Sequence, residues 1–199
     1  MTLKLGLTGS IATGKSTVLR ALGEMGVATF SSDDHVHDLY RGAAVPLVEA
    51  AFPGVAVDGA IDREKLSRHV VGHPERIRQL EAIVHPLVRA GIRRFLAEAE
   101  ATGVPIAVVD IPLLFENGVD WGLDGVIVTV VDEAELRRRA LARPGMTVEK
   151  LDAILARQMP QAEKTKRATY ILDTGASIET TRAEVAELVR TLTEQTKAR

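Results

Sequence analysis

The chain has 199 residues, of which 46% are apolar and 26% are charged, with a formal net charge of −2 and no cysteine. This length suits one well-packed domain with an inserted subdomain, and the lack of a basic excess argues against general nucleic-acid or anionic-membrane binding. A disulfide framework, a cysteine-based metal site and a membrane span are also excluded, since there is no cysteine and no apolar run of about 18 residues. With no signal-like segment at the N-terminus, we expect a cytoplasmic monomer without nucleic-acid or membrane partners.

The first expected strand, residues 4–8, leads into a loop that fits the phosphate-binding pattern G-x-x-x-x-G-K-[ST]. The loop consists of Gly9, Ser10, Ile11, Ala12, Thr13, Gly14, Lys15 and Ser16, and Thr17 follows it. Helical apolar spacing predicts a helix over 15–25, with Gly26 as its C-cap. This strand–loop–helix order places the positive end of the helix beneath bound phosphates.

The residue types in this loop specify its chemistry. Backbone N–H groups surround the triphosphate, Lys15 reaches the β and γ phosphates, and the Ser16 hydroxyl coordinates Mg²⁺. The sequence therefore predicts that Gly9 through Thr17 bind a nucleoside triphosphate with Mg²⁺.

Strands separated by helical segments continue along the chain, which predicts an α/β fold with a five-stranded parallel sheet flanked by helices. The further expected strands are 27–30, 104–110, 125–131 and 170–172. The expected helices are 76–82, 87–101, 133–141, 148–158 and 178–192, with turns at Phe52-Pro53-Gly54 and Gly72-His73-Pro74.

The stretch between the second and third strands is too long for a simple crossover. We therefore predict a single P-loop kinase-like domain over 1–199 that carries a helical substrate-binding insert and a lid. The expected core is 1–34, 104–131 and 168–199, the insert is 35–103, and the lid is 132–167.

Asp33 follows the second strand, at the edge of the sheet where ligands bind in such folds. One hypothesis makes it the group that accepts or orients the proton of an acceptor hydroxyl. The other makes it only the N-cap of the helix that follows. Position alone does not separate the two.

Two other acidic positions follow apolar runs. Asp110 ends the third strand before Ile111-Pro112 and is a candidate to hold Mg²⁺ through water. Asp132 and Glu133 resemble an ATPase signature, but Glu135 lies three residues beyond Asp132, as in a capping box, so we interpret this pair as structural.

Arg137, Arg138, Arg139 and Arg143 form a basic cluster. Arg139 and Arg143 are four residues apart and can share a helix face, and arginine stabilises a phosphoryl group in transfer. Arg143 precedes Pro144-Gly145, a turn that suits a lid. Arg137 and Arg138 fit a solvated helix face, and His85, taken alone, fits a structural histidine at a helix start.

Several segments together resemble the dephospho-coenzyme A kinase family over nearly the whole chain. Besides the loop and Asp33, they are His85-Pro86-Leu87-Val88, Pro112-Leu113-Leu114-Phe115-Glu116, Arg139-Ala140-Leu141-Ala142-Arg143 and Gln158-Met159-Pro160. The resemblance implies that ATP, with Mg²⁺, phosphorylates the ribose 3′-hydroxyl of dephospho-coenzyme A, giving coenzyme A and ADP.

The resemblance also implies roles for single residues. Asp33 becomes the base, Lys15 and the loop hold ATP, and Arg139 and Arg143 belong to a lid that also binds ATP, with Arg143 catalytic. The insert around His85, together with Pro112, Leu113, Leu114, Phe115 and Glu116, forms the side that takes the coenzyme A moiety.

The chain departs from the family pattern at three positions. Ser31 stands where the family often has the first Asp of Asp-Ala-Asp, Thr169 replaces the Asp of an Ala-Asp pair, and Thr174 replaces an Asn. A nucleoside monophosphate kinase is the main rival, because it shares the loop, the acidic residue and the lid arginines. A GTPase switch is excluded, since the single asparagine, Asn117, is not in Asn-Lys-x-Asp.

Overall fold

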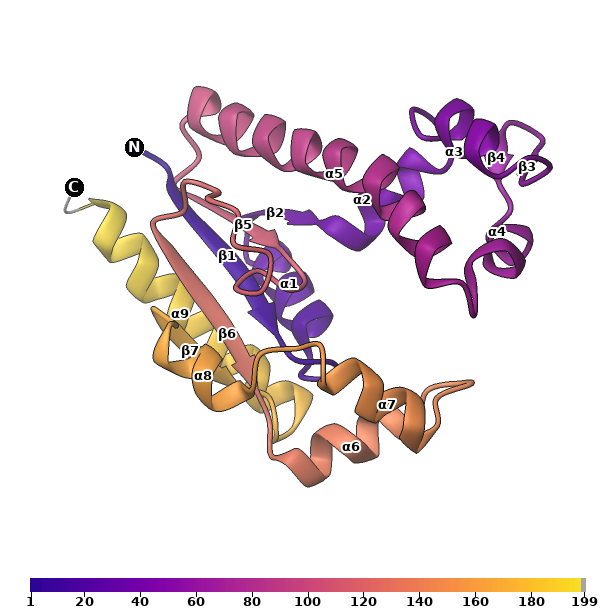
Figure 1. Ribbon diagram of the computed structural model, residues 1–199. Coiled ribbons are helices and arrows are strands. Elements are labelled where there is room, and N and C mark those ends of the chain that lie inside the picture. Colours follow the sequence, from indigo (N-terminus) through magenta and orange to yellow (C-terminus); the bar gives the residue numbers. More distant parts are fainter. Residues whose placement is uncertain (198–199) are drawn as a thin grey trace. The chain divides into compact units, whose positions relative to one another are not determined.

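The computed structural model describes residues 1–197 and divides into two compact units (Figure 1). The sheet unit consists of Met1–Phe30 and Leu96–Arg199, and the helical unit of Ser31–Phe95. Each unit is described by itself. None of the described helices is long and apolar enough to cross a membrane.

Five strands form the sheet in the order β2-β5-β1-β6-β7, as the α/β prediction requires. They are β1 (Leu3–Gly9), β2 (Ala28–Ser31), β5 (Ile106–Asp110), β6 (Gly125–Val130) and β7 (Tyr170–Asp173). β1 pairs in parallel with β5 on one side and with β6 on the other, and β6 pairs in parallel with β7. Strands β2 and β5 lie on one side of β1, whereas the later strands β6 and β7 lie on its other side. In such sheets the ligand binds where the connections change sides, so ligands are expected beyond the carboxyl end of β1.

Five helices of the described residues belong wholly to the sheet unit. They are α1 (Lys15–Glu24), α6 (Glu133–Leu141), α7 (Val148–Leu155), α8 (Gln161–Lys166) and α9 (Ile178–Lys197). Of these, α1, α8 and α9 contact the strands of the sheet. α1 packs against α9, and their apolar faces join the strands in one core that includes Leu7, Val18, Val108, Ile127 and Val185. Every residue of β5 is buried, as its continuous apolar run predicts for a central parallel strand.

The helical unit has a separate small core around Phe52, which is fully buried with Val48 and Val55. Its elements are α2 (Ser32–Leu39), α3 (Val45–Ala51), β3 (Ala56–Val57), β4 (Ala60–Ile61), α4 (Arg63–Val70) and the first part of α5 (Pro74–Thr102). β3 and β4 form an antiparallel hairpin that the sequence analysis missed. The sequence does contain a signal for this hairpin, because Asp-Gly, here Asp58-Gly59, is a dipeptide typical of tight hairpin turns. Both residues have positive φ, as such a turn requires.

Several predicted boundaries were wrong. The two helices expected at 76–82 and 87–101 are one helix, α5, which passes through Pro86. His85 therefore lies inside this helix, exposed, and not at a helix start. The helix expected at 148–158 ends at Leu155, and the short helix α8 was not predicted. Pro86 removes one backbone donor, yet apolar side chains on both sides of it pack into the same core and sustain the helix.

Candidate active site

The phosphate-binding loop joins β1 to α1 and depends on two glycines. A Cβ at Gly9 would lie 2.2 Å from the Thr129 hydroxyl oxygen and 2.8 Å from the Thr129 carbonyl oxygen, so no side chain fits there. Gly14 has φ +76° and is the N-cap of α1. Ala12 also has a positive φ of 61°, a conformation that L residues rarely adopt. The loop is thus held in a shape that the local sequence alone would not favour.

Buried hydroxyl groups hold this shape from inside the sheet. The Thr13 hydroxyl donates to the Ser10 carbonyl oxygen at 2.8 Å and lies 2.7 Å from the Thr129 hydroxyl of β6. The Thr174 hydroxyl, after β7, donates to the Thr13 carbonyl oxygen at 3.0 Å. The loop is therefore braced by residues from β6 and from the end of β7.

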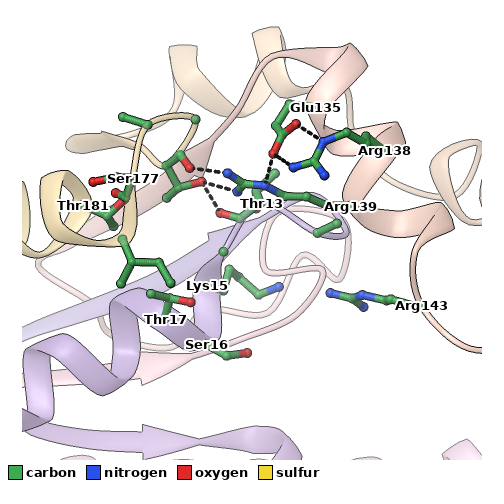
Figure 2. Close-up of a pocket in the computed structure, with 16 residues that line it drawn as sticks. Thr13, Lys15, Ser16, Thr17, Glu135, Arg138, Arg139, Arg143, Ser177 and Thr181 are labelled. Atoms are coloured by element: carbon green, nitrogen blue, oxygen red, sulfur yellow. Dashed lines mark hydrogen bonds and ion pairs between the residues drawn. The ribbon is translucent and has the colours of Figure 1, made fainter.

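A cavity of about 640 Å³ opens over the loop and the first turn of α1 (Figure 2). Its walls are Ala12, Thr13, Gly14, Lys15, Ser16, Thr17, Glu135, Arg138, Arg139, Arg143, Thr174, Gly175, Ala176, Ser177, Ile178 and Thr181. The positive end of α1 and the Lys15 side chain face this space, which suits an anion. Most of the predicted loop residues line the cavity, whereas Gly9, Ser10 and Ile11 do not.

Arg139 is anchored at the opposite wall. Its guanidinium donates to Glu135 Oε1 at 2.7 Å and to the Thr174 carbonyl oxygen at 2.7 Å. Glu135 also accepts from Arg138, and the hydrogen bonds from Arg138 and Arg139 lower the pKa of Glu135 to about 2. These contacts fix the two arginines at the cavity edge.

Arg143 lies just beyond α6, and its guanidinium extends toward the Lys15 ammonium in Figure 2. Arg139 and Arg143 line the same cavity. α6 ends at Leu141, as expected, so the two arginines do not share a helix face. Arg137 pairs instead with Glu133 and Asp152 and does not line the cavity. Arg138 is exposed, as its interpretation as a solvated residue predicts, and it also lines the edge of the cavity.

The N-terminus of α6 confirms the structural interpretation of Asp132. Its carboxylate caps the helix by accepting from the Ala134 N–H at 2.8 Å. The expected capping box is wrong in its second half, because Glu135 pairs with the two arginines.

The segment after β5 is tightly packed. Asp110 is 4% exposed and pairs in register with Leu7 of β1, close to where the loop begins. Leu113 has φ +56°, and buried Leu114 packs so closely on Gly6 that a Cβ there would lie 2.6 Å from its Cδ1. The segment can therefore keep one conformation beside the loop.

Phe115 and Glu116 end this segment, and both make internal contacts. The Arg167 guanidinium lies over the Phe115 ring, with its Cζ atom 5.9 Å from the ring centroid. Glu116 forms an ion pair with the fully buried Lys164. Within residues 112–116, Pro112 is the exposed residue.

Asp33 and His85 lie in the helical unit. Ser31 is the N-cap of α2, and its side chain accepts from the Asp34 N–H at 3.1 Å. Asp33 is exposed in the first turn of α2 and is not the cap, so the N-cap hypothesis for it was wrong. Ser31, a departure from the family pattern, thus has a structural role of its own.

The other two departures also have clear contacts. Thr169 accepts from the Val126 N–H at 3.0 Å and donates its own N–H to the Val126 carbonyl oxygen at 2.8 Å. Thr174 joins the loop, Val130 and Arg139 through its hydroxyl and carbonyl groups. Thr129 and Gln158 also contact the loop and were missed, because only the fold brings such distant residues together.

A phosphate-binding loop at the switch point of a parallel sheet, faced by lysine and arginines, defines the class of P-loop kinases. The solved shikimate kinase from Bacteroides thetaiotaomicron shares this fold, with a TM-score of 0.51 over 94% of this chain and 98% of that one, at 16% identity. That likeness concerns the fold alone.

The family model described as Dephospho-CoA kinase matches residues 3–180. A dephospho-CoA kinase from Rhodopseudomonas palustris (strain HaA2) is 51% identical over 94% of each chain, and one from Mesorhizobium japonicum is 53% identical over 93% of this chain and 94% of its own. The solved dephospho-CoA kinase from Campylobacter jejuni has a TM-score of 0.72 at 27% identity, covering 97% of this chain and 98% of that one. The chain belongs to the dephospho-CoA kinase family.

Proposed function

We propose that the residues described above carry out the dephospho-CoA kinase reaction, the final step of coenzyme A biosynthesis, with ATP and Mg²⁺. The family assignment rests on identity near 50% over most of the chain. The observation that carries the chemistry is the 640 Å³ cavity, in which the phosphate-binding loop faces Lys15, Arg139 and Arg143. Three cations around one anion-binding loop suit a triphosphate, whose transferring group needs charge stabilisation.

The proposed reaction transfers the γ-phosphoryl group of ATP. The bond between the γ-phosphorus and the β–γ bridging oxygen breaks, and a bond forms between that phosphorus and the ribose 3′-oxygen of dephospho-coenzyme A. The hydroxyl proton passes to the Asp33 carboxylate, and ADP leaves. Asp33 suits this role because it is an exposed carboxylate that caps no helix.

The other roles follow the same pattern. Lys15 and the loop from Gly9 to Thr17 hold the phosphates, and Arg139 and Arg143 hold the nucleotide from the lid side. The Ser16 hydroxyl, with Asp110 through water, would hold Mg²⁺, which would neutralise negative charge on the phosphates. A hydroxyl and a carboxylate are oxygen donors of the kind that this ion prefers, and the Ser16 side chain is exposed at the first turn of α1.

His85 and residues 112–116 are proposed to take the coenzyme A moiety of the acceptor. Exposed Pro112 and His85 are the members with open surfaces, while the internal contacts of Leu114 and Glu116 hold the segment in place. We further propose that the protein acts as a cytoplasmic monomer.

A coupled assay of ADP release tests the acceptor. ATP and Mg²⁺ are supplied with dephospho-coenzyme A, with nucleoside monophosphates or with shikimate as separate acceptors. Rapid ADP release with dephospho-coenzyme A alone is expected. Release with a nucleoside monophosphate instead would refute the proposed acceptor while keeping the kinase class, and release without any acceptor would indicate an ATPase.

A further inference from the structure

The segment that follows α7, residues 158–164, contacts three separate parts of the sheet unit, and we call it the strap. Gln158 accepts from the Ile11 N–H at 3.0 Å, and the Met159 N–H donates to Glu116 at 2.7 Å. Lys164 pairs with the same carboxylate. The Gln161 amide both accepts from the Val131 N–H and donates to the Val131 carbonyl oxygen, each at 3.1 Å.

Gln158 is the strap residue bonded to the phosphate-binding loop. Its oxygen takes up the Ile11 N–H, which therefore points toward the strap. Residues from Ala12 to Thr17 line the nucleotide cavity, whereas Ile11 and Gln158 do not. Any effect of Gln158 on the nucleotide must act through the loop backbone.

On the side of the strap, the loop borders an open space. A second cavity of about 380 Å³ lies there, lined by Ser10, Glu133, Leu136, Leu155, Gln158, Met159, Pro160, Gln161 and Ala162. Ala12 packs with Ala140 and Leu151, and the Ile11 side chain packs against the same cluster. The hydrogen bond to Gln158 adds a directional restraint on the Ile11 backbone, which non-directional apolar contact does not supply. Ala12, which follows Ile11, has the unfavourable φ of 61°, so the loop backbone would relax if the Ile11 N–H were released.

We propose that Gln158 is a positioning residue for the phosphate-binding loop: its side-chain oxygen holds Ile11 so that the N–H groups from Ala12 onward face the phosphates. The strap also continues the segment that begins with α6 and α7, which carries Arg139 and Arg143. The bond thus connects the loop on one side of the nucleotide with the segment that supplies the arginines on the other. The inference deepens the proposed function and requires only that the loop binds ATP.

The test compares two substitutions in the strap. Gln158→Met keeps the length of the side chain and removes the acceptor for Ile11. Gln161→Met is the matched control, since it removes two hydrogen bonds from the same strap without touching the loop. ATP affinity is measured by calorimetry without an acceptor substrate, and protection of the Ile11 amide by hydrogen exchange.

Gln158→Met is expected to weaken ATP binding about five- to tenfold, the effect of about one hydrogen bond, and to expose the Ile11 amide. Gln161→Met should leave the ATP affinity and the hydrogen-exchange protection of the Ile11 amide within about twofold of their values in the unmodified protein. Equal weakening of ATP binding in the two variants would overturn the proposal, because the strap would then act only through stability. Unchanged ATP affinity in Gln158→Met would overturn it as well.

A second variant covers the case in which Gln158→Met does not fold. Gln158→Glu keeps an oxygen acceptor at the same length, so the Ile11 amide should stay protected. Loss of protection in a folded Gln158→Glu variant would also refute the role of the acceptor. Since none of these measurements uses dephospho-coenzyme A, a wrong acceptor in the proposed function would leave the results unchanged.

Discussion

The Nζ atom of Lys164 lies 2.9 Å from Oε1 of Glu116, and the lysine side chain is fully buried. This ion pair joins α8 to the segment after β5, which are far apart in sequence. A buried lysine is costly unless its charge is paired, so the two residues depend on each other. Removing one partner is expected to be far more damaging than removing both.

We predict that Lys164→Met lowers the free energy of unfolding by about 3–5 kcal/mol, because it leaves the Glu116 carboxylate without its cation. The double variant Lys164→Met with Glu116→Gln keeps an oxygen acceptor for the Met159 N–H and should recover much of the loss. Urea denaturation of both variants measures this difference. A double variant as unstable as the single one would contradict the explanation.

The same pair predicts a dependence on pH. Burial raises the pKa of Glu116, but hydrogen bonds from Lys164 and Met159 outweigh it, so the folded pKa is below its usual value. The stabilisation is therefore complete above the usual glutamate pKa and is lost as the pH falls through the lower folded pKa. In the unmodified protein, the urea midpoint should therefore be lower at acid pH than at neutral pH, and Lys164→Met should reduce this difference. If the difference persisted unchanged in Lys164→Met, another carboxylate would be responsible for it.

Glu135 should remain ionised at pH values well below the usual pKa of a glutamate. Hydrogen bonds from Arg138 and then Arg139 lower its pKa from 4.5 to about 2. Because the folded pKa is lowered, its stabilising effect is present above about pH 4.5 and is lost as the pH falls toward 2. A carbon-13 NMR titration of the side-chain carboxyl, assigned with Glu135→Gln, measures this. A midpoint near 4.5 would show that the arginine contacts do not persist in solution.

Lys15→Ala should reduce phosphoryl transfer about a hundredfold or more, because it removes a cation from the β and γ phosphates. Lys4→Ala is the control, since Lys4 pairs with Glu100 and does not line the nucleotide cavity. The coupled ADP assay measures both variants. Near-normal turnover in Lys15→Ala would remove the argument from the phosphate-binding loop.

Asp33→Asn should lower kcat by about 10²-fold or more while changing the KM for ATP little, because a base acts only as the hydroxyl attacks. Asp34→Asn is the control, an exposed carboxylate in the same turn of α2. Full kinetics with ATP varied at saturating acceptor separate the two effects. A raised KM for ATP with unchanged kcat would instead indicate a role in holding the metal or the nucleotide.

Gly9→Ala should abolish ATP binding, because the new Cβ would overlap the Thr129 hydroxyl and carbonyl oxygens of β6. Gly23→Ala is the control: Gly23 lies in α1, where a Cβ meets only the Thr29 hydroxyl at 3.4 Å. That helical substitution should stabilise the protein by about 1 kcal/mol. Calorimetry with ATP and thermal unfolding measure the pair, and ATP binding by Gly9→Ala would contradict the packing argument.

The sequence by itself determined the features that depend on local spacing. The loop pattern from Gly9 to Ser16 predicted the phosphate-binding site, and strands alternating with helices predicted the parallel sheet. Asp132 was correctly interpreted as a helix cap because its cap signal lies within a few residues. These features can be predicted because local hydrogen bonding and periodic burial depend on residues that are close together in the sequence.

Only the tertiary structure decided which distant residues brace that loop. Thr129, Gln158 and Thr174 are separated from it by more than a hundred residues in sequence, and nothing in their neighbours marks them as loop contacts. The Lys164–Glu116 ion pair could not be predicted for the same reason, because a lysine or a glutamate considered alone is expected to be exposed. These residues acquire their roles when the strands and the strap pack together, and the spacing of residues along the sequence does not specify that packing.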